Sequence, residues 1–165
     1  LRYPYTDNVI GDRSFGNSVP KVVMLCNEAI KAIQEQGGIP IVKHMPGHGR
    51  AKQDSHYDLP RITDSIEELN KADFEVFRQL VKNNDNIWGM TAHIVFDALD
   101  PDSPVTLSKK AINFIRQEIG FKGILVTDAI EMGALHGEIG QQYSNVIKNH
   151  NDSSQSVVKI SDQEF

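Results

Sequence analysis

The sequence has few of the features that mark membrane, disulfide-rich or nucleic-acid-binding proteins. Its 165 residues include one cysteine, Cys26, so a disulfide framework and a thiolate metal cluster are excluded. No apolar run approaches the roughly 18 residues that a membrane-spanning helix needs, and the N-terminal residues contain no apolar signal core. The 17 Lys and Arg residues are outnumbered by 22 Asp and Glu residues, which argues against a phosphate-binding surface. We expect a soluble, cytoplasmic protein with no nucleic-acid or membrane partner.

The length and composition are those of one globular domain, with a different character at the C-terminal end. Hydrophobic residues make up 39% of the chain and charged residues 24%, the balance of a packed protein. After residue 139 polar residues crowd together without an apolar face, so we divide the chain into a folded part, residues 1–139, and a polar tail, residues 140–165. The chain begins at Leu1 rather than at methionine, which indicates a fragment, a processed product or an unusual start.

Apolar periodicity predicts helices and strands in alternation. We place helices at residues 20–36, 64–82 and 108–119, and strands at residues 39–44, 87–95 and 121–127. Asp64 and Glu67, three residues apart, have the pattern of a capping box for the second helix, and Ser108 is the expected cap of the third. Alternation of this kind is typical of an α/β fold in which crossover helices connect parallel strands.

Side chains that could carry chemistry follow the predicted strands. Lys43 and His44 end the first strand, His93 lies in the second, and Asp128 follows the third. Functional groups of parallel α/β folds gather at this edge. Each candidate also has a structural interpretation. Lys43 could form a strand-end salt bridge, His44 and His93 could be core histidines, and Asp128 could cap a helix that follows it.

The loop over residues 45–62 is long for a compact domain, and such loops are usually functional. It contains Asp54 and His56, two residues apart. A carboxylate in this position can hold one imidazole nitrogen and stabilise the imidazolium, which leaves the other nitrogen free to exchange a proton near neutral pH. An isolated Asp-x-His pair, however, is more often two solvated loop residues.

A metal site is the minor interpretation of four side chains: His44, His48, Asp54 and His56. Zinc binds through imidazole nitrogens and carboxylate oxygens. However, Pro46 and Gly47 prevent a regular helix between the two first histidines, so their spacing loses its diagnostic geometry. A metal-dependent hydrolase therefore stays only as an alternative.

Several motifs taken together resemble one enzyme family. They are Ile10-Gly11-Asp12-Arg13-Ser14-Phe15, Lys43-His44-Met45-Pro46-Gly47-His48-Gly49, Asp54-Ser55-His56 with Leu59-Pro60, Ala92-His93-Ile94, Thr106-Leu107-Ser108, and Gly120-Phe121-Lys122-Gly123 through Thr127-Asp128. This combination resembles the bacterial β-N-acetylhexosaminidases of glycoside hydrolase family three, from residue 8 to residue 139. A chance match to so many motifs would be surprising.

The resemblance implies a fold, a substrate and a set of roles. The fold is a TIM-type (β/α)₈ barrel, and the substrate is a terminal β-linked N-acetylglucosamine, typically on muropeptides released from peptidoglycan. By resemblance Asp128 is the nucleophile, His56 the general acid/base and Asp54 its partner. The residues that the resemblance assigns to binding of sugar hydroxyls are Arg13, Lys43 and His44. No metal or organic cofactor is implied.

The chain is short for that fold. A TIM-type barrel takes about 250 residues, whereas this sequence contains three convincing strands. We therefore expect a partial barrel of about three parallel strands with flanking helices, which leaves two open sheet edges. Such a fragment should be marginally stable unless a complementing chain completes the barrel. A non-catalytic remnant of the enzyme is the alternative to an active glycosidase.

Overall fold

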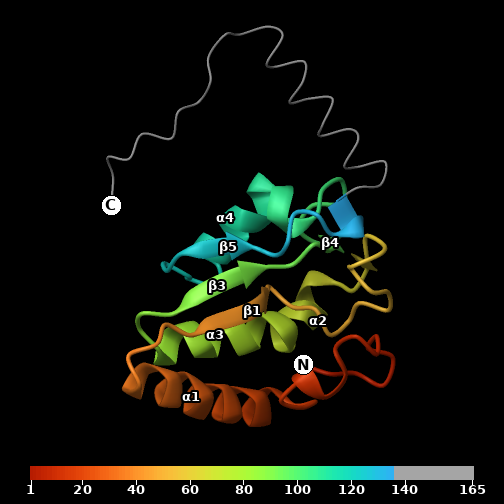
Figure 1. The fold of residues 1–165 in the computed structure, drawn as a ribbon. Helices are drawn as coiled ribbons and strands as arrows, with labels where there is room; N and C mark the ends of the chain where they lie inside the picture. Colours follow the sequence, from red (N-terminus) through yellow and green to blue (C-terminus); the bar gives the residue numbers. More distant parts are fainter. Residues whose placement is uncertain (136–165) are drawn as a thin grey trace, which may run out of the picture.

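The computed structural model describes residues 1–135 (Figure 1). The elements, in chain order, are η1 (Gly11–Arg13), α1 (Val19–Glu35), β1 (Ile41–Met45), β2 (Arg61–Ile62), α2 (Ile66–Lys71), α3 (Asp73–Asn83), β3 (Trp88–Thr91), β4 (Val95–Phe96), η2 (Val105–Leu107), α4 (Lys109–Gln117), β5 (Leu125–Thr127) and η3 (Gly133–Leu135). The predicted tail, residues 140–165, lies outside the described residues. Within residues 1–135, no helix has the length and apolar character needed to span a bilayer.

Three strands form a parallel sheet in the order β1–β3–β5, with β3 in the middle (Figure 1). Gly89 of β3 pairs with Val42 on one side and Leu125 on the other. A Cβ atom at Gly89 would lie 2.5 Å from the Sδ atom of Met45, so the close packing of the sheet requires glycine here. β2 and β4 form a second, two-stranded parallel sheet. The predicted alternation of helices and parallel strands is therefore confirmed.

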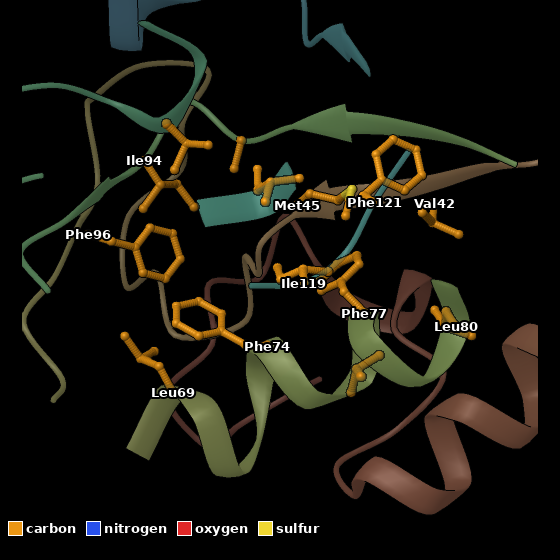
Figure 2. Packing of buried hydrophobic residues seen from close by; sticks show 14 of the residues in the cluster. Val42, Met45, Leu69, Phe74, Phe77, Leu80, Ile94, Phe96, Ile119 and Phe121 are labelled. Atoms are coloured by element: carbon orange, nitrogen blue, oxygen red, sulfur yellow. The ribbon is translucent and has the colours of Figure 1, made fainter. Parts of the chain in front are cut away.

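The hydrophobic core lies between the three-stranded sheet and the helices (Figure 2). Val42 and Met45 face it from β1, and Phe77 and Leu80 face it from α3. The ring of Phe74 joins the elements, since its centroid lies 4.8 Å from that of Phe114 in α4 and 5.9 Å from that of Phe96 in β4. Each fully buried aromatic or aliphatic side chain contributes roughly 1.5–3 kcal/mol. This packing fixes the strands whose ends carry the candidate site residues.

The second helix departs from the prediction in two ways. Its capping box consists of Ser65 and Glu68, not Asp64 and Glu67: the Ser65 hydroxyl accepts from the Glu68 N–H, and the Glu68 carboxylate accepts from the Ser65 N–H. Asp64 is unavailable as a cap because its carboxylate pairs with Arg50. The predicted helix also divides into α2 and α3 at Ala72, whose φ of −134° and ψ of −80° are not helical.

The strands are shorter than predicted. The segment predicted as one strand over residues 87–95 divides into β3 and β4, because after Thr91 the chain leaves the first sheet and the Val95 N–H donates to the carbonyl of Pro60 beside β2. The segment over residues 121–127 contributes only β5, since Phe121 packs into the core before the strand begins. The first strand, Ile41–Met45, begins two residues later and ends one residue later than predicted. Ser108 caps α4 as predicted, with its hydroxyl accepting from the Ala111 N–H.

Candidate active site

The ends of β1 and β5 bring together two of the predicted site residues. His44 is the fourth residue of β1, and Asp128 directly follows β5. The His44 Nε2 atom lies 3.2 Å from the Asp128 Oδ2 atom, and both side chains are largely buried. The expectation that strand ends would gather these groups at one edge of the sheet therefore agrees with the structure.

Burial determines the charge of His44. Burial, together with the neighbouring His48, Lys43 and Arg13 side chains, lowers the pKa of His44 to about 3, although the Asp128 carboxylate acts in the opposite direction. His44 is therefore a neutral imidazole at neutral pH. It presents a polar group without a positive charge to the Asp128 carboxylate.

Asp128 does not cap a helix. Its Oδ1 atom accepts a hydrogen bond from the N–H of the adjacent Ala129 at 2.9 Å, and the next residues form a turn and the short η3 instead of an α-helix. The helix-capping interpretation of Asp128 is thus wrong. A partly buried carboxylate at a strand end, without a helix to stabilise, is costly unless it has another use.

Asp54 and His56 form the hydrogen-bonded pair that their spacing suggested. The His56 Nδ1 atom lies 2.6 Å from Asp54 Oδ1, and the His56 backbone N–H donates to the same oxygen at 2.9 Å. Burial alone would raise the pKa of Asp54, but the backbone and ring hydrogen bonds from His56 more than offset it and hold the pKa below its usual value. The His56 side chain is 52% exposed. The geometry fits an imidazole held in one orientation with Nε2 directed away from its partner.

His48 connects the strand-end pair to the loop pair. Its Nε2 atom lies 3.2 Å from the hydroxyl of Ser55, the residue between Asp54 and His56, and its ring centroid lies 5.1 Å from that of His44. Burial lowers the pKa of His48, against the attraction of the Asp128 and Asp54 carboxylates. Within residues 1–135, the Nδ1 atom of His48 has no hydrogen-bond partner.

Arg13, Lys43 and His44 line one cavity of about 330 Å³, together with His48. Arg13 lies in η1, and its Nε–H donates to the Val9 carbonyl at 2.9 Å. Apolar side chains of α1 and α3 form the remaining wall. The three residues predicted to bind sugar hydroxyls are thus brought together, whereas Asp128, Asp54 and His56 are not part of this cavity lining.

His93 is a core histidine, which was its structural alternative in the sequence. It is buried, with Nδ1 at 2.7 Å from the Thr106 hydroxyl and Nε2 at 2.9 Å from the Ala129 carbonyl. Since a carbonyl only accepts, Nε2 carries the proton, and His93 holds the backbone next to Asp128. For a metal site, residues 1–135 contain no group of three or more His, Cys, Asp or Glu side chains arranged to hold an ion.

A partly buried carboxylate and a carboxylate-backed imidazole, at the carboxyl edge of parallel strands, are typical of a hydrolase site. A family model, "Glycosyl hydrolase family 3 N terminal domain", matches residues 4–149. The chain belongs to glycoside hydrolase family 3, as the motif resemblance implied.

Named relatives and solved structures agree with this family. A beta-hexosaminidase of Photobacterium profundum is 37% identical over 74% of this chain and 36% of its own length. A family 3 β-N-acetylglucosaminidase from Paenibacillus superposes with a TM-score of 0.76 at 36% identity, over 81% of this chain and 26% of that one. NagZ from Neisseria gonorrhoeae superposes with a TM-score of 0.73 at 33% identity, over 79% and 37% respectively. The chain therefore spans about a third of its relatives' length and has the fold of a partial TIM-type barrel.

Two residues at the site were not anticipated from the sequence, Ser55 and Gly133. Ser55 is buried and contacts His48, and the Gly133 N–H donates to the His56 carbonyl at 2.9 Å. A serine between two polar loop residues carries no burial signal, and no turn pattern marks Gly133. The one signal in the sequence is that Ser55 separates the two members of the Asp-x-His pair.

Proposed function

We propose that this chain carries the catalytic residues of a glycoside hydrolase that removes terminal β-linked N-acetylglucosamine with retention of configuration. The observation that carries the proposal is the pairing of two kinds of group. Asp128 is a partly buried carboxylate beside a neutral imidazole, and His56 is an exposed imidazole backed by the Asp54 carboxylate. Retaining hydrolysis needs one group that attacks and one that gives and takes a proton.

In the first step the Asp128 carboxylate attacks the anomeric carbon of the sugar. The bond from that carbon to the glycosidic oxygen breaks, and His56 donates its Nε2 proton to the departing oxygen. In the second step neutral His56 accepts a proton from water while the water oxygen attacks the anomeric carbon and releases Asp128. Asp54 stabilises the imidazolium form that exists between turnovers.

Arg13, Lys43 and His44 serve in this proposal as ligands of the sugar hydroxyls. They line a common cavity that does not itself include Asp128, but His44 lies 3.2 Å from Asp128, so a sugar bound at His44 would lie next to the nucleophile. A neutral His44 suits this task because it can donate and accept hydrogen bonds without attracting Asp128 into a fixed ion pair.

The substrate class follows from the relatives. Those named above are a beta-hexosaminidase and β-N-acetylglucosaminidases, and NagZ of N. gonorrhoeae has a structure in complex with N-trifluoroacetyl-D-glucosamine. We extend this to muropeptides derived from peptidoglycan, processed in the cytoplasm during cell-wall recycling. The location stays a prediction, since one relative, from Arthroderma benhamiae, is described as a secreted glycosyl hydrolase.

The test is incubation of the purified chain with nitrophenyl β-N-acetylglucosaminide. We expect release of nitrophenol that disappears in Asp128→Ala, and a glycosyl adduct on the Asp128 peptide in rapidly quenched samples analysed by mass spectrometry. Turnover that persists in the variant, or an adduct on another residue, would contradict the assignment.

The two outer strands of the three-stranded sheet carry exposed apolar side chains at their edges. Ile41 at the edge of β1 and Ile124 beside β5 are exposed, as is Ile39, although each is a large apolar side chain. Within residues 1–135, both β1 and β5 have only β3 as a neighbour. We propose that a complementing chain pairs with these edges. The alternative function, a non-catalytic remnant, would be supported by well-folded protein without turnover.

Urea unfolding of the purified chain tests the need for a partner. We expect a broad transition at low urea, because edges and apolar side chains that lack neighbours reduce stability. A cooperative two-state transition of a monomer would contradict this expectation.

A further inference from the structure

The hydrogen bond within the Asp54–His56 pair does not fix the position of the pair relative to Asp128. Its internal hydrogen bond orients the imidazole relative to Asp54, but that bond joins two residues of the same loop. The His56 ring is half exposed, so packing does not hold it. For His56 to protonate a bond attacked by Asp128, other contacts must hold the loop at a fixed place relative to β5.

Ser55 supplies the first contact. It is 3% exposed, although serine is usually a surface residue and the side chains of its neighbours Asp54 and His56 are 24% and 52% exposed. Its hydroxyl lies 3.2 Å from His48 Nε2, and His48 is itself buried in the turn that follows β1. The loop is therefore tied to the end of β1 through a side chain that takes no part in the proposed proton transfer.

The backbone supplies the second contact, with the segment after β5. The Ala134 N–H donates to the Ser55 carbonyl at 3.3 Å, and the Gly133 N–H donates to the His56 carbonyl at 2.9 Å. Both donors follow Asp128 by a few residues. A Cβ atom at Gly133 would lie 2.6 Å from the His56 carbonyl oxygen and 2.7 Å from that of Tyr57, so this approach leaves no room for a side chain.

We propose that Ser55, with His48 and Gly133, positions the acid/base loop against the segment that carries the nucleophile. The side chain of Ser55 ties the loop to β1, and its backbone ties the loop to the chain after β5. Asp54 and His56 can then face the substrate while the residue between them faces the protein. This inference rests on the proposed function for its catalytic consequence, whereas the tie itself is independent of turnover.

The experiment substitutes Ser55→Ala in the full chain and measures kcat and KM for two N-acetylglucosaminides, one with a nitrophenyl and one with an alkyl leaving group. A displaced acid should matter most where the leaving oxygen needs protonation. We expect kcat/KM, which reports the first step, to fall by about tenfold or more for the alkyl glycoside and to change little for the nitrophenyl glycoside. The second step, in which His56 acts as base, is the same for both substrates, so kcat alone does not distinguish them.

Two further variants separate positioning from general destabilisation. Gly133→Ala pushes on the loop from the other side and should give the same dependence on the leaving group. Ser108→Ala is the matched control, because Ser108 is also buried and its hydroxyl also makes hydrogen bonds, to Asp100 and to the first turn of α4. It should lower stability but leave the ratio of the two kcat/KM values unchanged.

Amide hydrogen exchange, read by NMR, tests the tie without turnover. In Ser55→Ala the amide of Gly133 should exchange about tenfold faster than in the wild type, and in Ser108→Ala it should not. Unchanged exchange at Gly133, or an equal loss of kcat/KM with both leaving groups, would overturn the proposal. If the wild-type chain shows no turnover, the proposed function fails, and exchange at Gly133 alone decides whether Ser55 holds the loop.

Discussion

Two parts of the candidate site are held in different ways. His44 and Asp128 sit at strand ends, where their side chains are 11% and 23% exposed. Asp54 and His56 sit on the loop between β1 and β2, with side chains 24% and 52% exposed. The strand-end pair inherits its geometry from the sheet and the core beneath it. The loop pair is held by the few hydrogen bonds around Ser55, so the site combines a half held by the sheet and the core with a half held by hydrogen bonds.

This difference in how the two pairs are held matches the different requirements of a nucleophile and of an acid/base. A nucleophile must meet one carbon atom in one orientation, which suits a side chain fixed by a parallel sheet. An acid/base must first give a proton to the leaving group and later accept one from water, which suits a group on a loop near solvent. Substitutions in the two halves should therefore differ in their effects on turnover and on stability.

Asp128→Asn should abolish turnover. The substitution keeps the size of the side chain but removes the negative charge, so no covalent intermediate can form. We expect kcat to fall by about 10³-fold or more, in the range seen for loss of a nucleophile, with both good and poor leaving groups. Steady-state kinetics with the two glycosides measures it. Asp102→Asn, an exposed turn position, is the control and should leave kcat unchanged.

His56→Ala should give a selective loss instead. A poor leaving group needs the proton that His56 supplies, so kcat for an alkyl glycoside should fall by about 10²- to 10⁴-fold. A nitrophenol leaves without much assistance, and its first step should be far less affected. Pre-steady-state measurements of the two steps would show this. An equal loss for both leaving groups would contradict the acid role and remove the contrast with Asp128.

The sequence anticipated the strand-end half of the site better than the loop half. Parallel strands end at a common edge, so an apolar run followed by Asp128 and another followed by Lys43-His44 predict a meeting of these residues. The Asp54–His56 pair was also predictable, because two residues of separation suffice for its hydrogen bond. Local patterns of this kind need no knowledge of the remaining fold.

The contacts between the two halves were not predictable. The approach of Ser55 to His48 depends on the path of an irregular loop, and that of Gly133 to His56 joins residues far apart in the sequence. The register error at the second helix has the same cause. Asp64 fits the capping pattern as well as Ser65 does, and only its distant partner Arg50 decides between them.

Phe74→Ala should mark the difference in stability between the two regions. Phe74 is fully buried and touches the rings of Phe96 and Phe114, so its truncation should lower the free energy of unfolding by about 3–5 kcal/mol, which would leave a marginally stable chain largely unfolded even without urea. Tyr57, next to His56, is 81% exposed, and Tyr57→Ala should change it by less than about 0.5 kcal/mol. Urea unfolding followed by circular dichroism measures both. A large effect at Tyr57 would mean that the loop contributes to the core.

The two halves should lose their contributions to stability in different ranges of pH. Burial lowers the pKa of His44 to about 3 and also lowers that of His48, whereas an unfolded histidine has a pKa of 6.5. Between these values the unfolded chain binds protons that the folded chain does not, so stability falls as the pH falls below 6.5. Asp54 acts in a lower range. Its folded pKa lies below its usual value, so its contribution is lost only below about pH 4.

The free energy of unfolding can be measured by urea titration in steps from neutral pH downward. It should fall first because His44 and His48 are protonated in the unfolded chain. Each can contribute up to about 1.4 kcal/mol per pH unit. His44→Gln should reduce the slope above about pH 4, because glutamine binds no proton. Val42→Ala, a neighbouring buried position without a titratable group, should lower stability at every pH and keep the slope. An unchanged slope in His44→Gln would mean that the strand-end pair is as accessible to protons as the loop, and the contrast between the two halves would not hold.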